Sequence, residues 1–319
     1  MSYHVALFAL GLGLLAASTG LVVRGGAQLA RRWSVNPYVV GLIALGMGAS
    51  VGGLAFCICA VAHGRPRLAV GNLLGGNIAN VGLVLGLAAI VRPLAGSAKL
   101  ISSGIPALLI AALLFWFLSR DNELSQGDAG VLLAAFVAVL IYLGRIARQE
   151  PDSVRVEIAG WVPDTGSAWV GAIQVVLGVV GLVGGAELAV SEATRIYGES
   201  KITTPVLGFI AIIGTVLPGL VFAIAAARRG RANVVFGIVI GTNLTSLLLV
   251  SEATAMTGEF LLLHHAVMNE VPAMCLFMLL LITPLANGLK VSRVEGAILL
   301  AAFVAYAVWQ VTLAFEPQH

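Results

Sequence analysis

Residues 71–80, GNLLGGNIAN, recur in altered form as residues 237–246, GIVIGTNLTS. Both stretches keep the spacing Gly-x-x-x-Gly-x-Asn, and their first residues, 71 and 237, are 166 positions apart. The same offset relates Gly53 to Gly219. A recurrence at one fixed distance over this length indicates that the chain consists of two related halves.

The composition around these motifs is that of a membrane protein. Of the 319 residues, 59% are hydrophobic and only 10% are charged, whereas soluble domains carry about 25% charged residues. The 38 glycines agree with this class, because small residues let membrane helices approach closely. The net charge of +3 is too small, and the basic residues too scattered, to predict a nucleic-acid partner.

Windows of about 20 apolar residues, the length that crosses a bilayer, predict ten membrane-spanning helices. The spans are expected at residues 4–31, 36–62, 68–91, 98–118, 128–147, 167–195, 202–227, 232–254, 264–285 and 291–313. Five helices in each half is an odd number, so the two halves must have opposite orientations in the membrane. The predicted fold class is therefore an all-α polytopic membrane protein with two inverted five-helix repeats.

The basic residues predict the orientation, because Lys and Arg are enriched in cytoplasmic loops. If the N-terminus lies outside, the cytoplasmic loops hold 12 of the 18 Lys and Arg residues. We therefore expect a prokaryotic inner-membrane protein with both termini outside. The polar residues 151–166 form a cytoplasmic linker between the first repeat, 1–150, and the second, 167–319.

Each half contains two glycine-rich stretches inside predicted spans, at 46–53 and 71–80 and again at 214–219 and 237–246. Pro218 lacks a backbone donor and is expected to kink or break its helix. Interrupted backbone at membrane depth is tolerated only where it is buried or lines a cavity. Matching interruptions in two inverted halves predict a transport site near the membrane midplane. The alternative is that the glycines only permit tight helix packing.

These motifs resemble the two alpha-repeats of the cation/calcium exchanger superfamily. The family pattern is G-T-S-L-P-E followed by G-N-x-x-G-S-N-I-x-N. Residues 71–86 are similar to the second element, residues 214–218, GTVLP, to most of the first, and residues 185–190, GAELAV, to the start of a repeat. The resemblance covers nearly the whole chain. It implies the sodium/calcium exchanger fold and transport by alternating access between the repeats.

The departures from the family pattern concern the ion ligands. Gly53 and Gly219 stand where the family has its two ion-binding glutamates, and Gly76 replaces a serine. The resemblance leaves a set of candidate substrate- or ion-binding positions without any ionisable side chain. These are Ser50, Gly53, Asn77, Asn80, Thr215, Gly219, Thr242, Asn243 and Ser246. Glu187 is a possible acidic contributor from elsewhere in the chain.

The loss of both carboxylates argues against calcium as the substrate. Ca²⁺ takes 6–8 oxygen ligands and its protein sites normally include carboxylates. Hydroxyls and amides cannot repay the dehydration of a divalent ion at membrane depth, although they can hold a monovalent cation. We expect a monovalent cation or a less charged solute, for which two glycines enlarge the cavity. No metal at the divalent site and no cofactor are expected.

Other acidic residues within or near the spans have plainer interpretations. Glu187 occupies a position where the family often has an acid outside the ion site. Glu192 can pair with Arg195 one helical turn later. Glu252 is expected near the outer end of its helix, and Glu270 near a helix start, where the helix dipole favours an acid.

The remaining conspicuous side chains are expected to be structural. Cys57 and Cys59 point to different sides of one helix, so this pair predicts neither a disulfide nor a zinc site. Arg24 either extends to the cytoplasmic surface or meets an anionic substrate or Glu187. The histidines at 264–265 are expected at the membrane interface rather than on a metal.

Together these observations predict a secondary transporter with a small solute or monovalent ion as substrate and the lipid bilayer as surroundings. The alternative is a non-transporting scaffold or partner subunit with a degenerate ion site. An enzyme is not expected, because the spans contain no Ser/His/Asp set, no zinc-protease motif and no paired midplane carboxylates.

Overall fold

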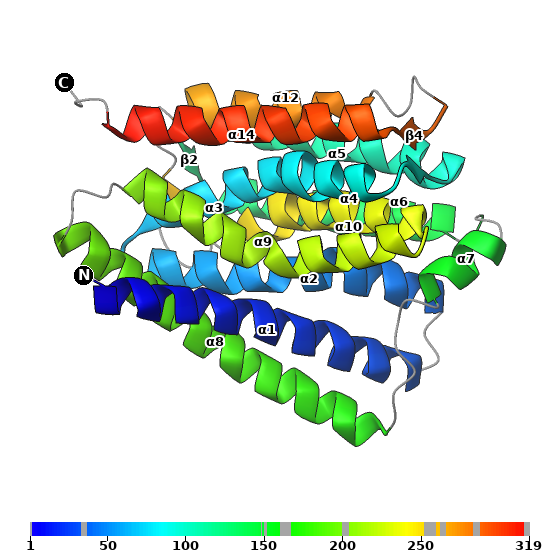
Figure 1. Ribbon diagram of the computed structural model, residues 1–319, viewed down its shortest axis with the longest axis horizontal. Helices are drawn as coiled ribbons and strands as arrows, with labels where there is room; N and C mark the ends of the chain where they lie inside the picture. Colours follow the sequence, from blue (N-terminus) through cyan, green and yellow to red (C-terminus); the bar gives the residue numbers. More distant parts are fainter. Residues whose placement is uncertain are drawn as a thin grey trace.

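The computed structural model describes residues 2–32, 37–147, 149, 152–159, 167–199, 204–251, 260–261, 266–282 and 288–315. Helices account for most of these residues (Figure 1). The first repeat contains α1 (Ser2–Arg32), α2 (Pro37–Ala62), α3 (Pro66–Ala79), the π-helix η1 (Asn80–Leu85), α4 (Gly86–Val91), α5 (Ala98–Leu118) and α6 (Gln126–Ala147). After α7 (Asp152–Ala159) come α8 (Ala168–Glu199), α9 (Thr204–Arg228), α10 (Ala232–Thr245), η2 (Ser246–Val250), η3 (Ala266–Glu270), α12 (Val271–Leu280) and α14 (Arg293–Phe315).

The predicted all-α membrane architecture is confirmed. Within the described residues, eight helical stretches are long and apolar enough to span a membrane, and two shorter apolar helices, Ser50–Ala62 and Val267–Leu280, complete the ten. The third span is one continuous run of α3, η1 and α4. The short helix α7, in the linker between the repeats, was not expected from the sequence.

Two pairs of two-residue strands reveal the opposite orientation of the halves. β1 (Leu94–Ala95) and β3 (Phe260–Leu261) are repeat equivalents, again 166 positions apart. β1 pairs with β4 (Lys290–Val291), and β3 pairs with β2 (Glu123–Leu124). Figure 1 places β4 and β2 at opposite ends of the helices. Equivalent strands at opposite ends are what inverted repeats require.

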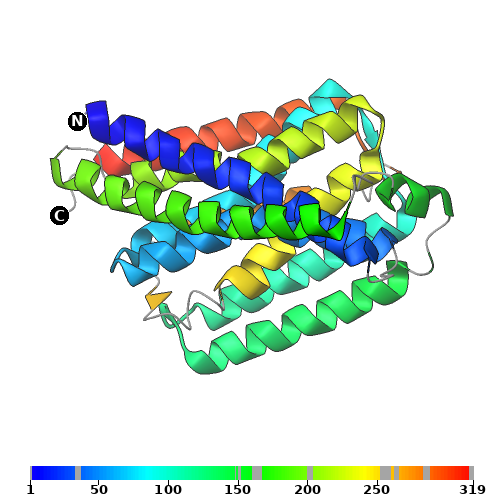
Figure 2. The ribbon, with the colours of Figure 1, turned by 90° about the horizontal axis from the view of Figure 1, so that it is seen from below.

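The longest helices, α1 and α8, pack against each other along one side of the molecule (Figures 1 and 2). They are antiparallel, since Gly11 lies against Ala189 and Gly25 against Gly171. A Cβ on Gly25 would come within 2.5 Å of the Gly171 carbonyl oxygen, so the two backbones are almost in contact. This packing explains part of the glycine content of the chain, as expected for membrane helices.

Of the two effects expected of Pro218, a kink or a break, the break does not occur. Helix α9 continues through Pro218 from Thr204 to Arg228. A proline removes only the hydrogen bond to the carbonyl four residues earlier, here that of Gly214, and neighbouring helices can support such a helix in a membrane. Within the described residues, π-helical geometry occurs at η1, η2 and η3, away from Pro218.

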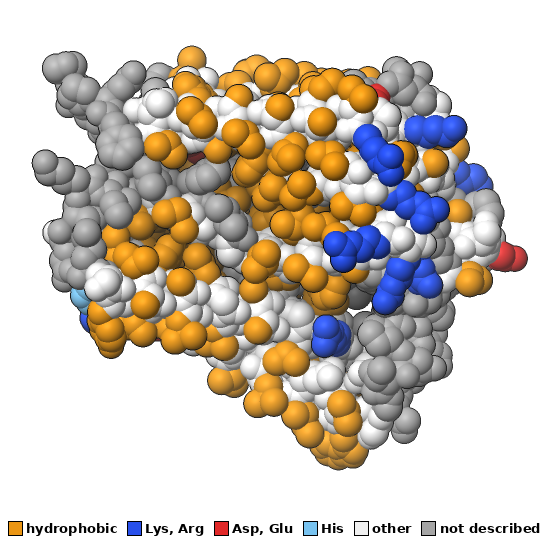
Figure 3. All heavy atoms as spheres, viewed as in Figure 1, with side chains coloured by type: hydrophobic (Ala, Val, Ile, Leu, Met, Phe, Trp, Pro, Cys, Tyr) orange, Lys and Arg blue, Asp and Glu red, His pale blue; other side chains and the backbone are white. Residues whose placement is uncertain are grey.

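The surface has the distribution of a membrane protein (Figure 3). Hydrophobic side chains cover the middle of the visible face, and large apolar residues such as Ile110, Val180 and Val294 are more than 55% exposed. Most of the visible Lys and Arg side chains gather at the end that carries α7 and β4 in Figure 1. Together with the apolar helices, this pattern identifies an integral membrane protein.

Candidate functional site

A polar cavity of about 30 Å³ lies where α2, α3, α9 and α10 meet. These helices form two repeat-related pairs, in which α2 packs against α10 and α3 packs against α9. The lining residues are Ser50, Gly53, Asn72, Gly76, Asn80, Thr215, Val216, Gly219, Thr242, Ser246 and Val250. All four helices of the cavity therefore bring residues of the glycine-rich stretches together.

Seven of the nine candidate positions line this cavity: Ser50, Gly53, Asn80, Thr215, Gly219, Thr242 and Ser246. The other two, Asn77 and Asn243, are fully buried and do not appear in its wall. Asn77 donates from Nδ2 to the Leu73 carbonyl over 2.7 Å. Asn243 accepts at Oδ1 a hydrogen bond of 3.0 Å from Asn80 Nδ2. This bond fixes the side chain of Asn80, which does line the cavity.

Asn72 lines the cavity although it was not among the residues predicted from the sequence. Its Oδ1 accepts a hydrogen bond from Thr215 Oγ1 over 2.7 Å, and its Nδ2 donates to Cys57 Sγ over 3.4 Å. The residue belongs to the 71–80 motif, but its repeat counterpart is the apolar Ile238. A search for polar residues present in both halves therefore does not find Asn72, whereas its place in the 71–80 motif could have indicated it.

Three hydrogen bonds across the cavity join the first repeat to the second. Ser50 Oγ donates to the Thr242 carbonyl over 3.2 Å, and the two bonds from Asn80 to Asn243 and from Thr215 to Asn72 complete the set. Each bond connects helices far apart in the chain. The polar side chains thus hold the two repeats together around the cavity.

Two of the three described π-helices begin at equivalent cavity residues, Asn80 in η1 and Ser246 in η2. The backbone N–H of Asn80 reaches the carbonyls of Asn77 and Gly76, and that of Ser246 reaches the equivalent carbonyls of Asn243 and Thr242. Short π-helical segments are rare and occur frequently at functional sites. Their symmetric placement around the cavity makes this part of the fold the candidate functional site.

The cavity glycines leave two kinds of space. A Cβ on Gly76 would meet nothing within 4 Å, so the wall is open there. A Cβ on Gly53 would lie 3.4 Å from Asn72 Nδ2, which is ordinary contact. Where α2 packs against α10 beyond the cavity there is no room for a side chain, because a Cβ on Gly46 would lie 2.7 Å from the Gly241 Cα.

The cavity presents oxygen lone pairs and no ionisable group among its lining residues. The hydroxyls of Ser50, Thr215 and Thr242 all donate their protons to protein acceptors. A hydroxyl oxygen that donates elsewhere still has lone pairs to offer. The wall can therefore coordinate a small cation, but it contains no nucleophile with a neighbouring base.

Glu187, the possible acidic contributor, and Glu192 do not line the cavity. The exposed Glu187 faces His63, with Nε2 and Oε1 3.0 Å apart. The expected pairing of Glu192 with Arg195 is confirmed at 3.6 Å, and Glu192 also contacts His4 Nδ1 at 2.5 Å. Arg24 is exposed and does not pair with Glu187, since α1 and α8 run antiparallel and place the two residues far apart.

The structure describes only some of the other residues that were given structural interpretations. Glu270 forms a side-chain hydrogen bond with Gln310, which the sequence did not predict. Glu252 and the histidines at 264–265 lie outside the described residues. All three cysteines are free, as expected for Cys57 and Cys59.

A polar cavity between two inverted five-helix repeats defines a secondary transporter of the membrane. The chain belongs to the sodium/calcium exchanger protein family, which matches residues 3–144 and 170–312. The family consists of exchangers rather than enzymes, as predicted, and the chain is thus a cation exchanger by family and fold.

Relatives from bacteria and archaea are similar over most of their length. The inner membrane protein YrbG of Escherichia coli is 30% identical over 260 residues, which cover 78% of each chain. The sodium/calcium exchanger MaX1 of Methanosarcina acetivorans is 27% identical over 94% of this chain and 96% of its own. A solved structure of the sodium–calcium exchanger NCX_Mj, soaked with Na⁺ and Sr²⁺, superposes with a TM-score of 0.68 at 26% identity, covering 96% of this chain and 98% of that one.

Proposed function

We propose that the chain exchanges monovalent cations by alternating access and that calcium is not its substrate. The observation that carries this proposal is the chemistry of the cavity wall. The described wall residues offer hydroxyl and amide oxygens and include no carboxylate, and the hydroxyls of Ser50, Thr215 and Thr242 donate to protein acceptors. Such a wall attracts a cation, but lacks the negative charge that a divalent ion needs.

The size of the cavity favours an ion over a bulkier solute. The space open to the centres of water-sized particles is about 30 Å³, which makes this a small cavity. An ion stripped of most of its water fits this space. The two glycines at 53 and 219 therefore act mainly by removing charge, and less by making room for a large solute.

The orientation and the repeat boundaries remain part of this proposal. The gathering of Lys and Arg at the end with α7 supports a cytoplasmic position for that end. Both termini would then lie outside. The 166-residue offset supports repeats at 1–150 and 167–319 joined by the linker 151–166. The cavity residues from both repeats would form the substrate site, with Asn77 and Asn243 behind it.

The experiment is a counterflow assay in proteoliposomes loaded with unlabelled sodium, potassium or lithium. We expect saturable uptake of a labelled monovalent cation, strongly reduced in Thr215→Val and retained in Thr215→Ser. Calcium uptake driven by a sodium gradient, abolished by Thr215→Val, would overturn the proposed substrate.

A second candidate function is a non-transporting scaffold or partner subunit. The observation that favours it is the mutual bonding of the cavity residues, since Ser50, Asn80 and Thr215 all bond across the repeats. Such bonds could hold one conformation permanently. Co-purification of a stoichiometric partner, together with no counterflow for any monovalent cation, would favour this function over transport.

A further inference from the structure

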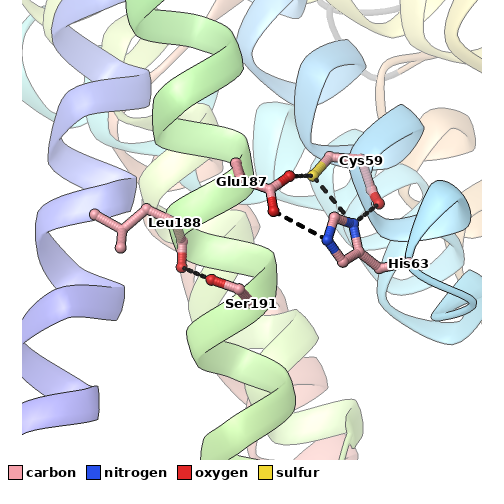
Figure 4. Close-up of polar contacts among 5 residues, drawn as sticks. All are labelled: Cys59, His63, Glu187, Leu188 and Ser191. Atoms are coloured by element: carbon pink, nitrogen blue, oxygen red, sulfur yellow. Dashed lines mark hydrogen bonds and ion pairs between the residues drawn. The ribbon is translucent and has the colours of Figure 1, made fainter.

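A second group of polar side chains lies outside the cavity, where the last turn of α2 meets α8 (Figure 4). Cys59, His63 and Glu187 place a sulfur, a nitrogen and a carboxylate oxygen within 4.8 Å of one another. Cys59 and His63 are four residues apart and thus lie on the same face of the helix end. Glu187 reaches them from α8, 124 positions later than His63.

We propose that Cys59, His63 and Glu187 form a binding site for a transition-metal ion of the Zn²⁺ class. Zinc is bound by these three ligand types, and open zinc sites use three protein ligands with water in a fourth position. The i, i+4 spacing of Cys59 and His63 is the spacing at which one helix presents two ligands to one zinc ion. The site goes beyond the proposed exchange function, which uses hard oxygen ligands elsewhere in the fold.

The distances agree with a tetrahedral site. Metal–ligand bonds of 2.0–2.3 Å place neighbouring ligand atoms roughly 3.3–3.7 Å apart. Cys59 Sγ lies 3.5 Å from Glu187 Oε2, and His63 Nε2 lies 3.0 Å from Glu187 Oε1, so the carboxylate is close to both other ligand groups. Small side-chain rotations bring all three groups onto one ion.

The histidine ring is oriented for metal binding. Nδ1 lies 2.9 Å from the Cys59 carbonyl oxygen, which only accepts, so Nδ1 carries the proton. A backbone carbonyl commonly fixes a metal-binding histidine in this way and leaves the other nitrogen as ligand. Nε2 then faces the Glu187 carboxylate, and two electron-rich atoms at 3.0 Å require a proton or a metal ion between them.

Charge balance and access also favour a divalent metal. A thiolate, a carboxylate and a neutral imidazole carry two negative charges together, which a Zn²⁺ ion neutralises. A neutral assembly is the least costly one at the boundary of a membrane. The side chains of His63 and Glu187 are 37% and 58% exposed, so an ion can reach them.

The site connects the cavity to the helix pair on the side of the molecule. Helix α2 carries Ser50 and Gly53 in the cavity wall, and Cys59 lies roughly 9 Å further along it, at 1.5 Å per residue. Helix α8 packs along α1 over its length. A metal bound here fixes α8 against α2, so Zn²⁺ is expected to slow exchange if the proposed function holds.

The binding test does not depend on transport. Tag-free protein in detergent is titrated with Zn²⁺ by calorimetry and with Co²⁺ by absorption spectroscopy. We expect one saturable site and a thiolate-to-cobalt charge-transfer band in the near ultraviolet. Cys59→Ala, His63→Ala and Glu187→Gln should each weaken binding at least about 100-fold, since even losing an outer-shell partner costs 10–100-fold.

Two further variants show whether the metal binds at this cluster or elsewhere on the protein. Cys275→Ala removes a cysteine outside the cluster and should leave binding unchanged. Cys59→His supplies another zinc ligand and should keep Zn²⁺ binding while losing the cobalt charge-transfer band. Absence of saturable binding in the unmodified protein overturns the proposal, as does undiminished binding in the folded Cys59→Ala and Glu187→Gln variants. The effect of Zn²⁺ on exchange is measured separately, and exchange that Zn²⁺ leaves unchanged would refute only the fixing of α8 against α2.

Discussion

Thr215 on α9 donates its hydroxyl proton to Asn72 Oδ1 on α3 over 2.7 Å, and this bond links the two repeats inside the cavity. Both side chains are buried, with exposed fractions of 6% and 4%. Neither partner has a polar repeat counterpart that forms the same bond, because Ala49 and Ile238 occupy the equivalent positions. The cavity is therefore less symmetric than the backbone around it.

Removing the Thr215 hydroxyl should destabilise the protein. Thr215→Val keeps the shape but leaves Asn72 Oδ1 buried without this donor, which costs about 1–3 kcal/mol. The change is measured as a lower thermal unfolding midpoint in detergent. Thr215→Ser restores the donor and serves as the control, and equal midpoints for the Val and Ser variants would show that the bond contributes nothing.

Restoring the two carboxylates should create calcium binding. A Cβ at Gly53 has room beside Asn72, and Gly219 lines the same cavity. The double variant Gly53→Glu/Gly219→Glu supplies the negative charge that a divalent ion requires. At a calcium concentration of 100 times Kd, binding stabilises the folded state by about 2.7 kcal/mol, which a calcium-dependent thermal shift detects.

The neutral double variant Gly53→Gln/Gly219→Gln has nearly the same volume and is the matched control. It should show no calcium-dependent shift, because it adds oxygens without charge. A calcium shift in the unmodified protein of the same size as in the glutamate variant would refute the electrostatic argument for a changed substrate.

The close approach of α2 and α10 should not tolerate a methyl group. A Cβ on Gly241 would lie 2.5 Å from the Gly46 Cα, so both backbones would have to separate. Gly241→Ala is expected to cost about 1–3 kcal/mol, as overpacking does, and to lower the unfolding midpoint. Gly13→Ala places a methyl group where nothing lies within 4 Å and should be neutral or slightly stabilising.

The predicted orientation can be read from the accessibility of single cysteines. In a background with the native cysteines replaced by alanine, Ser153→Cys on α7 should react with a membrane-impermeant maleimide only after the cells are opened. Ser2→Cys at the start of α1 should react in intact cells. Both positions are exposed. The reverse labelling pattern would place the basic end outside.

Much of the fold follows from short-range features of the chain. The length of each apolar run set the ten spans to within a few residues, and the 166-residue offset gave the pairing of the repeats. The sequence could not tell whether Pro218 breaks its helix, and the helix is continuous. The effect of a proline depends on the neighbouring helices that support the backbone, and those are distant in sequence. The motifs also led to most of the cavity lining, since repeated polar residues at membrane depth have few other roles.

Composition, periodicity and the internal repeat were sufficient to predict ten membrane helices in two inverted halves, because bilayer thickness and the hydrophobic effect act on local runs of residues. The resemblance of the motifs to the exchanger family then predicted an exchanger with glycines, Gly53 and Gly219, in place of the two acidic ligands. Contacts between distant segments came only from the folded chain. They include the bond from Thr215 to Asn72 and the meeting of Cys59 and His63 with Glu187. Helix rotation and tilt decide which side chains face each other, and packing against all neighbouring helices sets both.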